Sequence, residues 1–445
     1  MAVTRKDLFA GGSGGVLFTD RRDFYIDPQV VKELWTDVTP FTTVISNRET
    51  RQTNDPLFKM FEHRNPWVKQ YCYNNASTNA LDVDGSTTTE ITIDNITNLS
   101  SGPSDGSFVG LVFDVWTADY ADYRAQVICQ SSTDTVMTVQ TLKTASGSNY
   151  TMVDNDILLV VGNAHGEGSS APEPWYDELS VVYNSTQIFK TPLQVTGTLL
   201  QASLRGESSE LARLRSQKSQ EHKMQKEKAF LFGKRFGGTG LGESAFGTPD
   251  DTFGDTGNTD TAGNLIRTTY GILGAVNDYG SSTTTADEQN IFTISSSYDY
   301  GSFVDDMEKV FQYVPESGVK RAFCGAGALG YWSKIAGTDN IAGNSGWTVN
   351  VGDMKRDSLG FNYRILETPH GILQLIPTPA LRGPYNKYML IISEENCFHA
   401  QYRNPMYQTN IKTDNAFDGV KDQYFSDEGV GISLIDSHHL FKITA

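Results

Sequence analysis

One stretch of the chain constrains the fold more than any other: LARLRSQKSQEHKMQKEKAFLFG, which runs from Leu211 to Gly233. As a helix it is polar on every face for most of its length, yet it closes on three large apolar residues, Phe230, Leu231 and Phe232. An isolated helix this polar is only marginally stable in water. The sequence therefore predicts that neighbours hold the helix, either a sheet of its own subunit at the ends or other subunits along its length.

The beginning and the end of this helix carry recognisable signals. Thr198 and Gln201 form a T-x-x-Q capping box, so we expect the helix to begin at Thr198. Gly206, which two serines follow closely, is expected to kink or divide it. Gly233 is placed to end it in a left-handed turn. From Thr198 to Phe232 such a helix would be about 50 Å long.

The same helix is basic within an acidic chain. From Arg205 to Arg235 there are nine Lys or Arg and four Glu, and nine minus four leaves +5, whereas the whole chain has a formal net charge of -17. The overall acidity argues against a dedicated nucleic-acid-binding protein. Two interpretations of the helix stay open: a solvated face with i,i+4 pairs such as Lys223 with Glu227, or a stripe that contacts a polyanion.

Residues from about Met60 to Gly197 have the pattern of β-structure. Short alternating strands such as TTEITIDNITNL and YRAQVICQ are separated by Gly, Ser, Asp and Asn turns. Several brief strands at this spacing predict a small sandwich or barrel. Because the chain then leads into the long helix, we interpret the stretch as an excursion that leaves the main body and comes back.

Residues 1–58 have the pattern of an arm rather than of a domain. A glycine run at residues 11–15 precedes DPQVVKELWTDVTP, in which Asp27 and Pro28 predict the start of a helix and Pro40 its end. The apolar residues of this short helix would form a stripe that needs a partner surface. They are Val30, Val31, Leu34, Trp35 and Val38.

After the long helix the pattern changes twice. Residues 236–264 are rich in Gly and Asp and predict an exposed loop. From about Leu265 a compact α/β segment begins, in which SFVDDMEKVFQYV is an amphipathic helix and VKRAFCGAGALGYWSKIA is a strand, a turn and a helix. The last residues, GVGISLIDSHHLFKIT, predict a strand pair that finishes the chain.

The sequence contains no set of residues with catalytic or metal-binding spacing. The G-x-S-x-G at residues 11–15 lacks the flanking strand and helix of a nucleophile elbow, and His438 and His439 would point to opposite faces of a strand. Neither a membrane span nor a signal-peptide core is present. We therefore expect no enzyme, no cofactor and no membrane partner. Four widely spaced cysteines are expected to be small buried residues: Cys72, Cys129, Cys324 and Cys397.

Five phrases follow one another in a distinctive order. They are GEGSSAPEP (166–174), NSTQIFKTPLQVTGT (184–198), QEHKMQKEKAFLFGKR (220–235), RTTYGILGAV (267–276) and GISLIDSHHLFKI (431–443). Together with the order of arm, β excursion, polar helix and α/β segment, they resemble the major capsid proteins of tailed bacteriophages. Those proteins have the Hong Kong 97 fold, which encapsulins and herpesvirus shells share.

The resemblance implies an α+β fold of the Hong Kong 97 type, with parts that follow one another along the chain. Residues 1–58 would be the N-terminal arm, 59–195 the extended E-loop carrying the β-rich module, and 196–235 the spine helix of the peripheral domain. Residues 236–264 would be the Gly/Asp-rich loop, 265–404 the compact axial domain, and 405–445 C-terminal strands that return to the peripheral domain.

The resemblance also implies a function. The chain would be the self-assembling subunit of an icosahedral phage head that encloses double-stranded DNA, assembled in the host bacterial cytoplasm and located in the virion capsid. Its partners would be copies of itself in hexamers and pentamers, a portal protein, decoration proteins and a scaffolding protein. Because no long helical segment precedes the arm, the scaffold is expected to be a separate protein.

In this family the spine helix lies toward the inner surface, so its cations would meet packaged DNA without sequence preference. These inner-surface residues would be Arg213, Arg215, Lys218, Lys223 and Lys226. Phe230, Leu231 and Phe232 would anchor the helix in the subunit's own sheet. Two alternatives stay open: a secreted or tail-associated β-rich adhesin, and the subunit of an encapsulin-type compartment that encloses enzymes.

Overall fold

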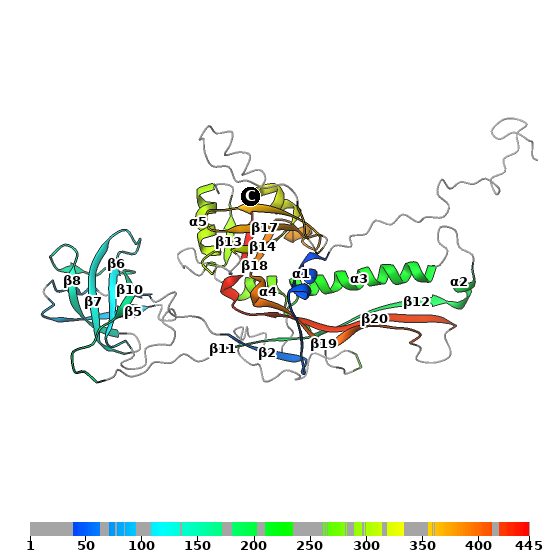
Figure 1. Ribbon diagram of the computed structural model, residues 1–445, viewed down its shortest axis with the longest axis horizontal. Helices are drawn as coiled ribbons and strands as arrows, with labels where there is room; N and C mark the ends of the chain where they lie inside the picture. The colour runs from blue at the N-terminus through cyan, green and yellow to red at the C-terminus, as the bar shows by residue number, and fades with distance from the viewer. Residues whose placement is uncertain are drawn as a thin grey trace, which may run out of the picture. The chain divides into compact units, whose positions relative to one another are not determined.

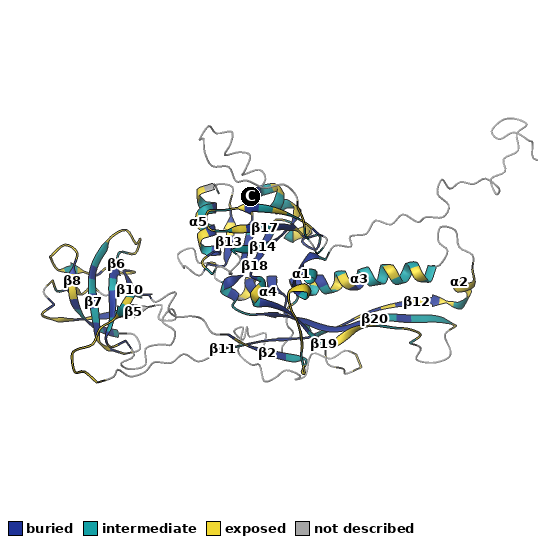
Figure 2. Cartoon of the chain, in the orientation of Figure 1, coloured by how far each residue is buried: buried dark blue, intermediate teal, exposed yellow. Residues whose placement is uncertain are grey.

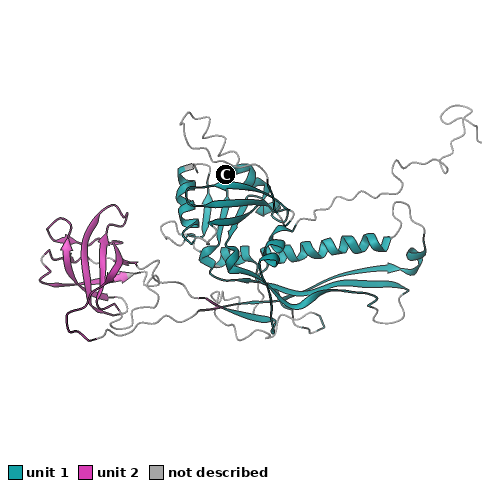
Figure 3. Cartoon of the chain, in the orientation of Figure 1, with its two compact units in different colours: residues 1–60, 182–445 teal, residues 61–181 magenta. Residues whose placement is uncertain are grey.

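The structure is a computed structural model of the chain. It describes residues 39–62, 71–75, 78–83, 85–94, 108–133, 136–170, 180–202, 210–234, 261–262, 264, 266–280, 282, 289–295, 298, 300–313, 318–332, 355–357, 359, 361–411 and 418–444. The chain divides into two compact units, one made of residues 1–60 and 182–445 and the other of residues 61–181 (Figure 3). The predicted helix after Asp27, the glycine run, and nearly all of the 236–264 loop lie outside the described residues.

The second unit is a closed antiparallel barrel. Its strands follow the order β10-β3-β5-β8-β7-β6 around the barrel, and every neighbouring pair is antiparallel. Their bounds are β3 (Tyr71–Asn74), β5 (Thr88–Asp94), β6 (Leu111–Trp116), β7 (Tyr123–Ser132), β8 (Val136–Thr144) and β10 (Ile157–Asn163), with β4 (Ala80–Leu81) and β9 (Tyr150–Thr151) paired separately. Alternate residues point inward, as Ala125, Val127 and Cys129 do in β7, and fill a core of their own. Of the two architectures predicted for this stretch, it is the barrel that forms.

Two short strands connect the units. The strands β2 (Leu57–Glu62) and β11 (Ser180–Ser185) form a two-stranded sheet at the points where the chain leaves and re-enters the first unit. Within the first unit, Phe58, Met60 and Val182 pack on Phe398 and Ala400. The excursion is therefore tied to the main body by a small apolar cluster at its base.

The first unit contains a four-stranded sheet that carries the long helix (Figure 1). The strand order is β1 (Thr50–Gln52), β19 (Cys397–Gln408), β20 (Gly419–Ile432) and β12 (Gln187–Thr196). The helices α1 (Pro40–Arg48), α2 (Gly197–Gln201) and α3 (Glu210–Phe232) belong to the same part. In β12 buried and exposed residues alternate, so one face of this edge strand is covered and the other is open.

The remainder of the first unit is a seven-stranded mixed sheet. Its order is β13 (Ile291–Ile294), β21 (His439–Ile443), β18 (Tyr388–Ile392), β14 (Val319–Cys324), β17 (Ile372–Pro377), β16 (Asn362–Glu367) and β15 (Lys355–Arg356). The helices α4 (Ile272–Tyr279) and α5 (Tyr300–Val310) accompany it, with 3-10 turns at Gly383–Tyr385, Glu394–Asn396 and Ile435–Ser437. Leu390 and Ile392 face the core that contains α4, whereas Met389 and Ile391 face the core that contains α5. The sheet is thus buried on both faces.

Several predictions for the long helix need correction. The helical stretch begins at Gly197, and its N-cap is Thr196, whose side chain accepts a hydrogen bond from the Leu199 amide, so Thr198 is not the cap. The first helix already ends at Gln201, and α3 begins at Glu210, with residues 203–209 outside the described part. Thr196 is the N-cap because it ends strand β12 in the extended backbone conformation that an N-cap residue requires.

Gly233 ends the long helix by a different mechanism from the one predicted. Its φ is not positive, so no left-handed turn forms there. A Cβ at this position would lie 2.4 Å from the carbonyl oxygen of Thr269 and 2.5 Å from that of Ala229. Glycine is needed because the segment before α4 passes directly over the helix end.

The end of the chain also differs from the prediction. We expected residues 405–445 to return to the sheet of the long helix and to finish as a strand pair. β20 does join that sheet, but β21 lies between β13 and β18 in the seven-stranded sheet and does not pair with β20. Leu434, with φ of 48°, and the 3-10 turn after it redirect the chain, and β21 is then buried on both faces.

Two predicted segment boundaries also differ from those of the structure. Residues 182–195, assigned to the excursion, include most of β12, and residues 397–404, assigned to the compact α/β segment, open β19. Both strands hydrogen-bond to β20 over long registers, which places them in the four-stranded sheet. Pro40 is the first residue of α1, a position that proline fits because its missing N–H costs nothing there, and the helix that it was predicted to end lies outside the described residues.

Candidate functional site on the long helix

The long helix α3 lies on the four-stranded sheet and is held there by polar contacts. His222 is buried between Thr191 of β12 and Ser426 of β20, with its Nδ1 2.9 Å from one hydroxyl and its Nε2 3.0 Å from the other. Burial first, and the nearby Lys226 second, lower the pKa of His222 to about 4. A neutral imidazole therefore bridges the two strands at neutral pH. The hydroxyl of Tyr424 also donates to the Arg215 carbonyl.

Two cations of α3 reach into the sheet. Arg215 donates to Asp422 at 2.8 Å, and Lys226 donates to Glu428 at 3.0 Å; both carboxylates are on β20 and are fully buried. Burial alone would raise the pKa of Asp422, but hydrogen bonds from Tyr407, a backbone amide and Arg215 outweigh it and lower that pKa. The arrangement is a pair of charge clamps between helix and sheet.

The carboxylate of Glu428 has a second neighbour besides Lys226. His399 Nε2 lies 3.3 Å from the Glu428 carboxylate. Burial of Glu428 opposes its ionisation, but the contacts with His399 and Lys226 outweigh it and lower the pKa of the carboxyl. A neighbouring carboxylate, Asp427, is also fully buried and contacts Arg267 and Arg403. Strand β20 is thus the anionic element on which the basic helix rests.

The other three predicted cations of α3 differ from these two in their partners. Arg213 pairs with Glu210, and Lys218 pairs with Glu221 at 2.7 Å, both within the helix itself. Lys223 is exposed, and it forms no ion pair with any residue that the structure describes. The five predicted DNA-facing residues are therefore not one open stripe: Arg215 and Lys226 hold buried carboxylates of the sheet, Arg213 and Lys218 are half-buried and pair within the helix, and Lys223 is exposed.

The apolar end of the helix lies in the core. Phe230 and Leu231 are almost completely buried, and Phe232 is half-buried and stacks on Tyr385 with 4.6 Å between ring centroids. Phe230 meets the ring of Phe189 edge-on at 6.2 Å. Figure 2 shows the buried colour gathered at this end of α3, close to α1 and α4. Burial of these apolar side chains removes them from water and so stabilises the attachment of the helix end to the core.

A further functional contact escaped the sequence reasoning. Glu227, fully buried, accepts hydrogen bonds from the backbone amides of Phe41 and Thr42, at 3.0 and 2.7 Å, and from the Thr42 hydroxyl. It caps α1 from another helix, where the free N–H groups and the helix dipole favour an anion. Burial raises the pKa of Glu227 against the effect of these bonds. The i,i+4 spacing predicts a pair of Glu227 with Lys223 instead. The one local signal that could have indicated this contact is Pro40, because proline also fits the first turn of a helix.

The described residues offer little else of chemical interest. They contain no group of three or more His, Cys, Asp or Glu placed to hold a metal ion. None of the helices in the described ranges has the length and apolar character to cross a membrane. The four cysteines are free and buried, as expected, and burial raises the pKa of the Cys129 thiol to about 12. His438 is buried too, and burial first lowers its pKa to about 3.

Residues 34–430 match the family model of a major capsid protein, the class of protein that builds the shell of a virus. The family is that of the SU10 major capsid protein, and the chain belongs to it. The protein is therefore a structural subunit of an icosahedral phage head and is located in the virion capsid. No curated protein sequence matches the chain.

Among solved structures, the chain resembles several shells at low identity. The capsid of a native GTA particle is 9% identical with a TM-score of 0.45, over 96% of both chains. The SrpI encapsulin of Synechococcus elongatus PCC 7942 is 7% identical with a TM-score of 0.38, over 60% of this chain and 76% of that one. The capsid of cyanophage P-SCSP1u is 6% identical with a TM-score of 0.36, over 64% and 80%. The family assignment rests on the sequence match.

Proposed function

We propose that copies of this chain assemble as hexamers and pentamers into a closed shell around double-stranded DNA. The observation that supports this most is the long helix, which is clamped to β20 on one side by Arg215 and Lys226 and stays polar on the other. Such a helix stiffens the sheet on which it lies, and only its apolar end needs a place in the core. Its outer side stays available to neighbours in a wall.

The parts of the chain fit the Hong Kong 97-like roles with shifted boundaries. The four-stranded sheet with α2 and α3 would be the peripheral domain, and the seven-stranded sheet, including β21, the axial domain. The chain between β2 and β11 would be the E-loop carrying the barrel. The separateness of residues 61–181 as a compact unit supports the last assignment.

We also propose that α3 meets packaged DNA through fewer cations than the sequence suggested. Lys226 is 13% exposed and holds a buried carboxylate, so a phosphate would have to take it from Glu428. Lys218, half-buried and paired with the part-exposed Glu221, and the exposed Lys223 hold no buried carboxylate and can approach phosphates, at the level of nonspecific counterion exchange. Replacing both by Gln should lower the DNA content of filled heads, whereas Lys228→Gln, on the same helix, is the single-charge control.

The partners follow from the shell. A separate scaffolding protein would set its curvature, and a portal protein would occupy one vertex. The barrel would bind a decoration protein or a neighbouring capsomer. Its outward residues include Leu142, Leu159 and Val161, each at least 40% exposed, which is the kind of surface that protein contacts cover.

Cryo-electron microscopy of the protein produced with its neighbouring head genes tests the proposal. We expect closed shells built of hexamers and pentamers, with nucleic acid inside when packaging genes are present. Isolated trimers or monomers would instead support the adhesin alternative. Closed shells that enclose protein and never DNA would support the encapsulin alternative.

A further inference from the structure

A buried carboxylate without a charged partner joins α1 to the long helix. Glu227 of α3 accepts hydrogen bonds from the amides of Phe41 and Thr42 and from the Thr42 hydroxyl, and all three donors are uncharged. Within the part of the chain that the structure describes, no residue with a positive charge pairs with Glu227. The negative charge is therefore balanced only by that hydroxyl and by the amide dipoles at the N-terminus of α1.

Glu428 of β20 shows what a charged partner changes. Both carboxylates are fully buried, and burial by itself raises the pKa of each carboxyl. At Glu428 the contacts with His399 and Lys226 outweigh burial and lower the pKa, whereas at Glu227 burial outweighs the three hydrogen bonds and the pKa is raised. On acidification Glu227 therefore takes up a proton before Glu428 does.

The charged groups on the elements around Glu227 do not supply the missing partner. The long helix contributes Lys223, which is exposed, and Lys226, which is held by the buried carboxylate of β20. Strand β19 contributes His399, which lies at that same carboxylate. The one charged residue of α1 is Arg48, at the last position of the helix and so at the end away from Glu227.

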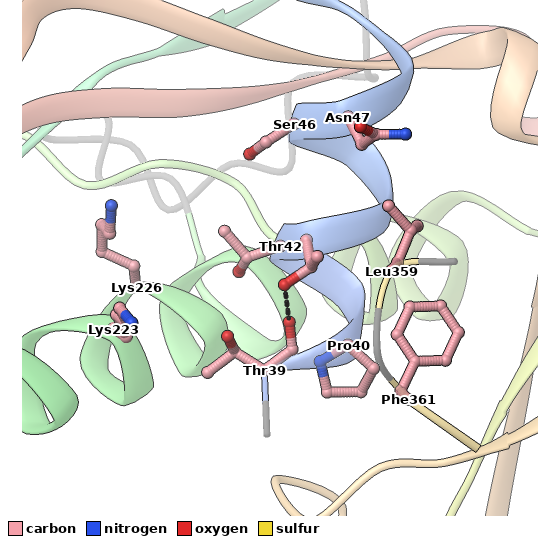
Figure 4. A pocket seen from close by; sticks show the side chains of 10 residues that line it. Thr39, Pro40, Thr42, Ser46, Asn47, Lys223, Lys226, Leu359 and Phe361 are labelled. Atoms are coloured by element: carbon pink, nitrogen blue, oxygen red, sulfur yellow. Dashed lines mark hydrogen bonds between the residues drawn. The ribbon is translucent and has the colours of Figure 1, made fainter. Parts of the chain in front are cut away.

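An open groove of about 590 Å³ beside α1 reaches this contact (Figure 4). Thr42 lines the groove, and the same residue donates both its amide and its hydroxyl to Glu227. Leu359 and Phe361, which line the groove as well, are uncharged. The opposite face of α1 is buried in the core. A proton can therefore reach the carboxylate by way of the Thr42 hydroxyl while the apolar face of the helix stays packed.

Protonation removes an acceptor from the first turn of α1. Oε1 of Glu227 accepts from the Phe41 amide at 3.0 Å, and Oε2 accepts from the Thr42 amide at 2.7 Å and from the Thr42 hydroxyl at 2.6 Å. A neutral carboxyl donates from one oxygen, and of these three groups only the hydroxyl can reverse its role and accept. The proton then sits on Oε2, so the Thr42 amide loses its charged acceptor and the Phe41 amide keeps only a neutral one.

We propose that Glu227 is an acid-sensitive contact: proton uptake by its carboxyl frees the first turn of α1 from the long helix, while the clamp at Glu428 keeps α3 on its sheet. Because α1 lies within residues 1–58, the opening loosens the attachment of the proposed arm to the long helix. All the contacts lie within one chain, so the proposal is tested whether or not copies of the chain assemble into shells.

Hydrogen exchange of the full-length chain between pH 7.5 and 4.5 tests the proposal. The measured quantity is the ratio of the exchange rate of a peptide from residues 40–48 to that of a peptide from β20, each corrected for the intrinsic effect of pH on exchange. We expect the ratio to rise about tenfold on acidification, because charge-assisted bonds of α1 are lost. A constant ratio would overturn the proposal, since α1 and the sheet would then respond alike.

Replacing the carboxyl identifies the group that takes up the proton. Glu227→Gln removes the titratable group, so the ratio should be high already at pH 7.5 and should no longer depend on pH. Glu221→Gln removes a part-exposed carboxylate from the same helix and should behave like the unaltered chain. A pH dependence that persists in Glu227→Gln would assign the effect to another group and would also overturn the proposal.

Thr42→Val changes the contact without changing the net charge. The Thr42 hydroxyl bond opposes the rise in the pKa of Glu227, so its loss should move the midpoint of the transition to higher pH. Thr43→Val is the matched control, because the Thr43 hydroxyl donates to the Thr39 carbonyl and not to Glu227. Equal midpoints in the two variants would contradict the proposal. Should a variant fail to fold, the pH series of the unaltered chain still decides.

Discussion

Removing the ammonium group of Lys226 is the sharpest test of how the long helix is held. In Lys226→Ala the Glu428 carboxylate stays fully buried and loses its lysine partner, with the imidazole of His399 3.3 Å away. Breaking a buried pair on one side costs about 3 kcal/mol, because an uncompensated charge remains. Lys218→Ala removes an equally basic residue of α3 whose partner Glu221 is part-exposed, and should cost about 0.5 kcal/mol.

Hydrogen exchange of backbone amides in α3 and β20 measures this difference locally. A loss of about 3 kcal/mol corresponds to exchange faster by roughly 100-fold in Lys226→Ala. Peptides from the barrel, which is a separate unit, serve as the internal reference. Lys226→Met combined with Glu428→Gln should recover most of the loss, since no buried charge is then left alone.

The destabilisation caused by Lys226→Ala should also depend on pH. Without Lys226 the burial of Glu428 is offset only by the contact with His399, so the pKa of that carboxyl rises above its value in the unaltered protein. The cost of Lys226→Ala should therefore shrink as the pH falls and Glu428 takes up a proton. If Lys226→Ala and Lys218→Ala accelerated exchange equally at pH 7, the clamp would have no energetic role and the reasoning would be refuted.

Three other predictions concern different parts of the chain. Burial lowers the pKa of His222 to about 4, so on acidification the imidazole takes up a proton in the unfolded chain before it does so in the folded one. The free energy of unfolding should therefore fall by roughly 3 kcal/mol as the pH drops from about 6.5 to 4. In acid denaturation His222→Gln should reduce this dependence on pH to the part that His438 contributes. Glu227→Ala should expose the amides of Phe41 and Thr42 and destabilise α1 by about 2 kcal/mol, seen as faster exchange in residues 40–48 but not in the barrel; unchanged exchange there would show that Glu227 is not its cap. Residues 61–181 expressed alone should fold into a monomeric β-protein with a cooperative thermal transition, and a fragment without ordered structure would contradict the independence of its core.

The sequence predicted elements well where the pattern is local. The amphipathic helix at residues 302–314 appears as α5, with Phe303, Met307 and Val310 in one core, because a period near 3.6 needs only a nearby apolar surface. The barrel strands were found through their period of two. Both signals lie within a dozen residues, so no knowledge of the rest of the chain was required.

The contacts that hold the site together could not be predicted in the same way. Lys226 and Glu428 are 202 residues apart, and Phe41 and Glu227 are 186 apart, so nothing in either local stretch names the partner. Gly233 was recognised as a helix end, but the reason for a glycine, the approach of Thr269, lies in another segment. The resemblance put the last strands in the sheet of the long helix, and nothing within His439–Ile443 indicates β13 and β18, with which β21 pairs instead.

The central claim is that this chain is the repeating wall element of a phage head, and a cryo-electron microscopy map of its assembled particles tests it most directly. The account predicts a closed icosahedral shell in which each subunit shows a long helix lying on a four-stranded sheet, with density for separate barrels. Particles that remain solitary subunits under every assembly condition, with the arm and the barrel ordered and no contact between copies, would contradict it.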